Sequence, residues 1–190
     1  MATLLITERL VLREFTEDDA EALFALDDDP EVMRYIGPLR LPTPDAYRQQ
    51  IRERLQPYYA RHPGYGFFAA VERSTGLFIG WFHLRPALDY RYAVQAGYQA
   101  GDLDLGYRLR RAVWGQGYAT EGSRHLVRRA FADPATRRIV ACALVGNLAS
   151  THVLEKVGME RQHQFAVPGH EMPGVRYVLT RERYEINQSV

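Results

Sequence analysis

Gly115 and Gly117 lie between a segment with the period of a strand and a segment with the period of a helix. Asp102–Leu109 alternates polar and apolar residues, which predicts a half-buried strand. Over residues 118–131 the apolar residues share one helical face. The first N–H groups of such a helix lack intrahelical partners and lie at the positive end of its dipole. A strand, a turn at residues 115–117 (the glycine turn) and a helix therefore predict a phosphate-binding site.

The residues around the glycine turn match two common phosphate-binding motifs poorly. A P-loop needs Gly-Lys-Ser/Thr where the helix starts, whereas Gly117 is followed by Tyr118 and Ala119. A dinucleotide-binding fingerprint needs Gly or Ala at the position of Thr120 and prefers the first strand–helix unit of a chain. A third type of phosphate ligand fits the sequence better.

The run W-G-Q-G-Y-A at residues 114–119 resembles the acetyl-CoA loop of the GCN5-related N-acetyltransferases (GNAT), with the pattern Gln/Arg-x-x-Gly-x-Gly/Ala. Gly117 and Ala119 match its last two fixed positions. Trp114 departs from the first, as is familiar in the RimJ/RimL-like branch. The segments T-E-R-L-V-L-R (7–13), D-P-E-V-M-R-Y (29–35) and N-L-A-S-T-H-V-L-E-K-V-G-M (147–159) also resemble this branch. The likeness thus extends over most of the chain.

The resemblance implies acetyl-CoA as a co-substrate and no metal. It also implies which residues contact the coenzyme, with Tyr107 and Leu109 acting through backbone groups and Asn147 bonding to the pantetheine arm. The full predicted set is Tyr107, Leu109, Arg110, Trp114, Gly115, Gln116, Gly117, Tyr118, Ala119, Thr120 and Asn147.

Acetyl transfer from a thioester to an amine requires mainly alignment, aided by proton transfer. Ser150 matches the serine that often acts as general acid in this branch. The alternative is that Ser150 or Asn147 only caps a helix. Asp104 is the candidate general base, and the alternative is an ordinary polar residue on an alternating strand. Further candidates for the base are Asp102, Glu72 and His83.

The surrounding sequence predicts the elements that hold these residues. Thr16 with Asp19 and Thr43 before Pro44 predict helix starts, and Pro57 should end or kink the helix that begins at Pro44. A further helix is expected over residues 147–156. Strands are expected at 7–15, 66–72, 77–85, 138–144, 161–167 and 175–180.

These elements predict an α+β fold with a mixed, mostly antiparallel central sheet flanked by helices. The resemblance implies the GNAT fold, in which two neighbouring strands splay apart and admit the pantetheine arm. Here those strands would be Asp102–Leu109 and Arg138–Leu144. Residues 86–101 have no clear period and are either a loop over the substrate site or only a connection.

Composition fits a single domain over residues 1–190. The chain is 46% apolar and 25% charged with a formal net charge of +1, which argues against a nucleic-acid or membrane partner. No signal peptide or membrane-length apolar run is visible, so a cytoplasmic protein is expected. The single cysteine, Cys142, lies in a predicted core strand, and the histidines show no metal-ligand spacing.

The predicted function is transfer of an acetyl group from acetyl-CoA to a primary amine, with a protein N-terminal α-amine as the favoured acceptor. Three alternatives stay open at this point. They are a small-molecule amine as acceptor, a coenzyme-binding module that performs no transfer, and a different nucleotide enzyme that uses the glycine turn. Whether the protein forms a homodimer is also open.

Overall fold

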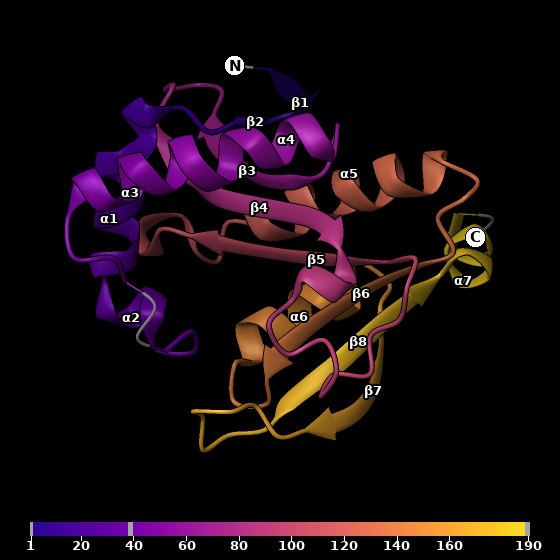
Figure 1. Cartoon of the computed structure of the whole chain (residues 1–190). Helices are drawn as coiled ribbons and strands as arrows, with labels where there is room; N and C mark the ends of the chain where they lie inside the picture. Colours follow the sequence, from indigo (N-terminus) through magenta and orange to yellow (C-terminus); the bar gives the residue numbers. More distant parts are fainter. Residues whose placement is uncertain (1, 38–39, 189–190) are drawn as a thin grey trace. The chain divides into compact units, whose positions relative to one another are not determined.

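The computed structural model (Figure 1) describes residues 2–37 and 40–188. These residues contain eight strands and form two compact units. The first unit comprises Met1–His83 and Tyr107–Gly122, and the second comprises Leu84–Gly106 and Ser123–Val190. Three elements begin in one unit and end in the other, namely β4 (Phe78–Pro86), β5 (Asp102–Leu109) and α5 (Tyr118–Ala132).

In the first unit the strand order is β1 (Thr3–Ile6), β2 (Leu10–Glu14), β3 (Gly66–Glu72) and β4, continuing with the end of β5. β2 is antiparallel to both β1 and β3. The strand predicted over 7–15 begins later, at Leu10. Thr7 and Leu10 instead close a turn, in which the Leu10 N–H donates to the Thr7 hydroxyl and the Thr7 N–H donates to the Leu10 carbonyl, both at 2.9 Å. β1 was not predicted.

The helix starts predicted at Thr16 and Thr43 are both present in this unit. The Thr16 N–H donates to the Asp19 carboxylate at 2.8 Å, ahead of α1 (Ala20–Asp28). Asp29 caps α2 (Pro30–Met33), and the Thr43 hydroxyl accepts from the Ala46 N–H at 3.2 Å, which caps α3 (Pro44–Gln50). These side chains satisfy N–H groups that a helix start leaves without partners.

Pro57 neither ends nor simply kinks the helix that begins at Pro44. Residues 51–55 form a π-helical segment after α3, and Pro57 then lies in the first turn of α4 (Gln56–Arg61), where a missing N–H costs no helical bond. Both helices run across β2 and β3 (Figure 1). The buried residues on this face, Tyr47 and Ile51, belong to one core cluster with Phe15, Ala20, Leu23 and Ala69.

We predict that Gly122→Ala destabilises the protein, although alanine normally stabilises a helix by about 1 kcal/mol relative to glycine. The side chain of Phe82 is fully buried against Gly122, and an added Cβ would lie 2.6 Å from Cε1 of its ring. Overpacking of this kind costs about 1–3 kcal/mol. Chemical denaturation should show a net loss of up to about 2 kcal/mol, and a raised midpoint would contradict the packing.

In the second unit the strand order is β5, β6 (Arg138–Leu144), β8 (Gly174–Thr180) and β7 (Glu160–Phe165). β6 is parallel to β5 and antiparallel to β8. In the described part of the chain the parallel pairing covers only 102–104 and 138–140, although both strands continue. The predicted mixed, mostly antiparallel α+β sheet is confirmed.

Two helices complete the second unit. α6 (Leu148–Lys156) begins after Asn147, as predicted, and Gly158 follows it with a φ of +92°, the left-handed conformation usual after a helix. α7 (Arg181–Gln188) was not predicted. It has no buried residue, so its sequence lacks the apolar stripe that marks most surface helices. No helix in the described residues is long and apolar enough to cross a membrane.

Candidate functional site

The glycine turn joins β5 to α5 with the bounds that the sequence predicts. Gly115 and Gly117 have φ angles of +73° and +84°, in the left-handed region that favours glycine. The first helical bond of α5 runs from the Glu121 N–H to the Gly117 carbonyl at 3.0 Å. The N–H groups of residues 118–120 therefore have no acceptor within the helix, as an anion site requires.

Side chains next to the glycine turn fix its backbone. The Trp114 indole N–H donates to the Leu109 carbonyl at 2.8 Å, and the Gln116 amide donates to the Ala112 carbonyl at 2.9 Å. The Arg110 N–H donates to the Ile79 carbonyl at 2.9 Å. The predicted coenzyme residues from Tyr107 to Thr120 thus lie on one bonded segment of the first unit, and their contact with a coenzyme stays a prediction.

A cavity of about 540 Å³ lies beside this segment in the first unit. Arg110 and Arg111 line it together with apolar side chains of α1, α2 and β4, and the Arg111 guanidinium lies 3.8 Å from the Asp29 carboxylate. Two cationic and two acidic side chains therefore line the cavity beside the turn that the sequence assigns to a phosphate. The complete lining is Ala25, Leu26, Asp29, Val32, Glu72, Leu77, Phe78, Ile79, Arg110, Arg111, Ala112 and Val113.

Glu72, one of the further candidates for the general base, is hydrogen-bonded to Tyr118, the first residue of α5. The Tyr118 hydroxyl donates to Glu72 Oε1, and the Thr75 hydroxyl donates to Oε2 at 2.7 Å. These bonds lower the pKa of Glu72, while the bond to Glu72 raises the pKa of Tyr118. The carboxylate thus anchors the helix start.

The prediction that Asp102–Leu109 is a half-buried strand is wrong at two of its polar positions, Asp102 and Asp104, which are buried. Both residues are 3% exposed. The Arg138 Nε donates to Asp102 at 2.8 Å, and the Arg85 Nε and Nη2 both donate to Asp104 Oδ2 at 3.2 Å. Buried carboxylates need such charged partners. The role of Asp104 as a general base stays a prediction.

Aromatic hydroxyls and the thiol gather around Asp104 in the second unit. Tyr90 and Tyr98 belong to the connection 87–101, whose residues Ala87, Tyr92, Ala93, Ala96 and Tyr98 are buried, so this segment packs into the unit. Burial raises the pKa of both tyrosines, and the nearby Asp104 carboxylate raises it further. Burial also raises the pKa of Cys142 to about 11, partly offset by a hydrogen bond with Tyr90.

We predict that Cys142 reacts slowly with iodoacetamide at about pH 8. A pKa of about 11 lowers the thiolate fraction roughly a hundredfold, and the more basic thiolate recovers up to about tenfold of that rate. Alkylation followed by mass spectrometry should therefore be at least about tenfold slower than for free cysteine. A rate equal to that of free cysteine would contradict the raised pKa of this thiol.

Asn147 and Ser150 lie at the start of α6, and the structure separates their roles. Asn147 is the N-cap, since its Oδ1 accepts from the Ser150 N–H at 3.2 Å. The alternative in which Ser150 caps the helix is therefore wrong. The assignment of the Ser150 hydroxyl as general acid stays a prediction, as does the contact of Asn147 with the pantetheine arm.

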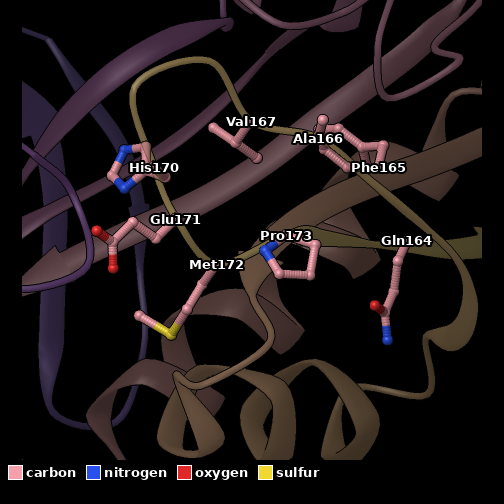
Figure 2. Close-up of a pocket in the computed structure, with 8 residues that line it drawn as sticks. All are labelled: Gln164, Phe165, Ala166, Val167, His170, Glu171, Met172 and Pro173. Carbon is pink, nitrogen blue, oxygen red and sulfur yellow. The ribbon is translucent and has the colours of Figure 1, made fainter.

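The histidines do not form a metal centre in the structure. Across residues 2–37 and 40–188, no three His, Cys, Asp or Glu side chains are grouped so that they could hold a metal ion. His83 is 8% exposed and packs against Phe67 and Trp81, with ring centroids 4.9 and 5.8 Å away. A second cavity, of about 290 Å³, lies between the end of β7 and the start of β8. Figure 2 shows the residues that line it, with His170 and Glu171 among them. Its lining contains none of the predicted site residues.

Arg9 is the residue that the sequence analysis missed. Its guanidinium contacts Gln116, Tyr118 and Glu121, so it touches both the glycine turn and the first turn of α5. The segment T-E-R-L-V-L-R was noted only as a likeness, because sequence separation hides a contact between residues more than 100 positions apart.

Comparison with protein families gives a match over most of the chain. The model of the acetyltransferase (GNAT) domain matches residues 9–160. FsC-acetyl coenzyme A-N(2)-transacetylase of Aspergillus fumigatus is 31% identical over 184 residues, which cover 94% of this chain and 76% of that protein.

Solved structures share the fold. Aminoglycoside acetyltransferase AAC(6')-Ib, in complex with coenzyme A and kanamycin, aligns with a TM-score of 0.72 and 24% identity over 94% of this chain and 99% of that one. Ribosomal-protein-S5-alanine acetyltransferase from Vibrio fischeri aligns with a TM-score of 0.74 and 15% identity over 96% and 98%. At these identities the alignments show the fold.

Proposed function

Because the chain belongs to the acetyltransferase (GNAT) domain family and is an acetyl-CoA-dependent N-acetyltransferase, we propose that its acceptor is an amine of low pKa, in the first place a protein N-terminal α-amine. The observation that carries the coenzyme site is the glycine turn, with Gly115 and Gly117 in left-handed conformations before the open N–H groups of α5. The backbone there offers donors to the pyrophosphate of acetyl-CoA.

The reaction forms a C–N bond and breaks a C–S bond. The neutral amine attacks the thioester carbonyl carbon, the amine nitrogen loses a proton, and the departing thiolate gains one. We propose that Ser150 donates the proton to the thiolate and that Asp104 accepts the proton of the amine. Asn147 uses its Oδ1 for the helix cap, so its NH₂ group is the part that donates to the pantetheine arm.

Most of the rate is expected from alignment. Holding two reactants in place supplies up to about 7–11 kcal/mol, whereas one general acid or base supplies about 10²–10⁴-fold. The position of Asp104 supports its assignment as the general base, because the parallel pairing of β5 with β6 ends at this residue. Its bonds to Arg85 keep its carboxylate oriented.

We predict that the enzyme prefers an α-amine to a lysine side chain. At pH 7 a lysine of pKa about 10.4 must lose a proton at a cost of about 4.6 kcal/mol, and an α-amine near 7.8 requires about 1 kcal/mol. The test compares kcat/KM, from release of free coenzyme thiol, for a peptide with a free N-terminus and no lysine and for a blocked peptide with one lysine. Preference for the blocked lysine peptide would contradict the proposal.

A small-molecule amine is the second candidate acceptor. The name of the Aspergillus relative, an N(2)-transacetylase that uses acetyl coenzyme A, favours it. The same assay distinguishes the two candidates, because activity on an amine panel with inactivity on both peptides would select the small molecule. A protein that binds coenzyme A and acetylates no amine would instead be a binding module.

Further sequence predictions belong to this proposal. The motifs W-G-Q-G-Y-A-T-E and V-L-E-K-V-G-M support the RimJ/RimL-like branch. A single domain over residues 1–190 and a cytoplasmic location stay predictions, and whether the protein forms a homodimer stays open.

A further inference from the structure

Arg9 bridges the glycine turn and the first turn of α5. Its Nη1 donates to the Gln116 carbonyl at 2.9 Å, and its Nε donates to Glu121 Oε2 at 2.6 Å. Its guanidinium also lies over the Tyr118 ring, 4.3 Å from the centroid. One side chain thus holds three residues of the segment assigned to the pyrophosphate.

The bond to Gln116 orients the next N–H. In a trans peptide the carbonyl of one residue and the N–H of the next point in opposite directions. Because Arg9 binds the Gln116 carbonyl, the Gly117 N–H is directed away from Arg9. An added Cβ on Gly117 would lie 3.4 Å from Arg9 Nη2, so the guanidinium packs closely against this turn.

Arg9 is itself held in place from its own side. The Thr7 hydroxyl donates to Glu121 Oε1 at 2.5 Å, and the Arg9 N–H donates to the same oxygen at 2.9 Å. Arg73 Nη1 donates to the carbonyls of Thr7 and Glu8, both at 2.8 Å. The turn before β2 is therefore bonded to α5 through Glu121.

The carboxylate of Glu121 is kept in its charged form by these bonds. Burial raises its pKa, but the hydrogen bonds from Thr7 and Arg9 outweigh burial, and the net pKa is lowered. A charged Glu121 largely compensates the charge of Arg9. The main contribution of Arg9 to an anion site is therefore the fixed geometry of the backbone donors.

We propose that Arg9 is a positioning residue for the coenzyme, which holds the Gln116–Gly117 peptide so that its N–H points toward the pyrophosphate. This rests on the proposed binding of acetyl-CoA at the glycine turn. The function of Arg9 is to fix the direction of the donors before the coenzyme binds, so its loss weakens coenzyme binding more than turnover.

The test measures coenzyme A binding by calorimetry, and steady-state kinetics, for wild type, Arg9→Gln, Arg9→Lys and the control Arg52→Gln. Arg52 carries the same charge in the same unit but pairs with Glu17. Arg9→Gln should raise the Kd for coenzyme A and the KM for acetyl-CoA about tenfold, as expected for losing hydrogen bonds to a charged group. Its kcat at saturating acetyl-CoA should change by less than about twofold, and Arg52→Gln should match wild type in all constants.

Arg9→Lys separates position from charge. Lysine keeps the charge but lacks the planar fork that binds Gln116 and Glu121 together, so it should recover less than half of the loss in binding free energy. Full recovery by lysine would overturn the positioning role, as would an unchanged Kd in Arg9→Gln. If Arg9→Gln does not fold, the same comparison of Kd is made for Arg9→Lys alone, where a wild-type value overturns the proposal. A wild-type protein without affinity for coenzyme A would instead overturn the proposed function.

Discussion

Gly117→Val should weaken the binding of acetyl-CoA by more than about a hundredfold. Gly117 has a φ of +84°, a conformation that a β-branched residue adopts only with strain, so the turn must change its backbone to accept valine. Each N–H bond to a charged oxygen contributes roughly 1.5–3 kcal/mol, so losing two of them gives this effect. Calorimetry with coenzyme A measures the change directly.

Gly76→Val is the matched control. Gly76 lies in the turn between β3 and β4 with a φ of +70°, and an added Cβ would have no neighbour within 4 Å. Both variants should lose about 1–2 kcal/mol of stability from backbone strain, but Gly76→Val should bind coenzyme A as wild type does. Equal affinity of both variants for coenzyme A would show that the glycine turn is not the binding site.

Ser150→Ala should lower kcat about a hundredfold, the lower range of a lost general acid, with little change in the affinity for acetyl-CoA. This substitution keeps the helix cap, because the Asn147 Oδ1 that caps α6 accepts from the Ser150 N–H, which alanine retains. The expected loss of stability is below about 0.5 kcal/mol. Turnover per folded molecule, from thiol release, is the measurement.

Asn147→Ser is the companion variant. Serine keeps an N-cap oxygen but removes the NH₂ donor. It should raise the KM for acetyl-CoA with kcat nearly unchanged, the opposite pattern to Ser150→Ala. If Ser150→Ala turns over as wild type does, the serine is structural and water or another group protonates the thiolate.

Elements with strong local signals were predicted accurately. β5 and β6 have the predicted bounds, and α5 begins at Tyr118 as expected, because periodicity and glycine turns act over a few residues. The exposed helix α7 and the short edge strand β1 carry little apolar pattern and were missed. The capping function of Asn147 could be stated from sequence only as one of two alternatives.

Contacts between distant segments could not be predicted. The acidic residues of β5 were expected as the polar positions of a half-buried strand, yet Arg85 and Arg138 pair with them and allow their burial. Arg9 lies over a turn more than 100 positions away, and nothing in local spacing indicates that contact. The alternation of a strand tells which residues share a face, but not which charged partners reach that face.

We expect the glycine turn and the start of α5 to bind the coenzyme through backbone N–H groups. Titration of isotope-labelled protein with coenzyme A, followed through the backbone amide resonances, tests it most directly. The largest shifts should fall on the amide resonances of Gly115, Gly117 and residues 118–120. The resonances of Gly76 and Gly169, which share the same backbone conformation, should not shift. Large shifts confined to other segments, or none at millimolar coenzyme A, would contradict it.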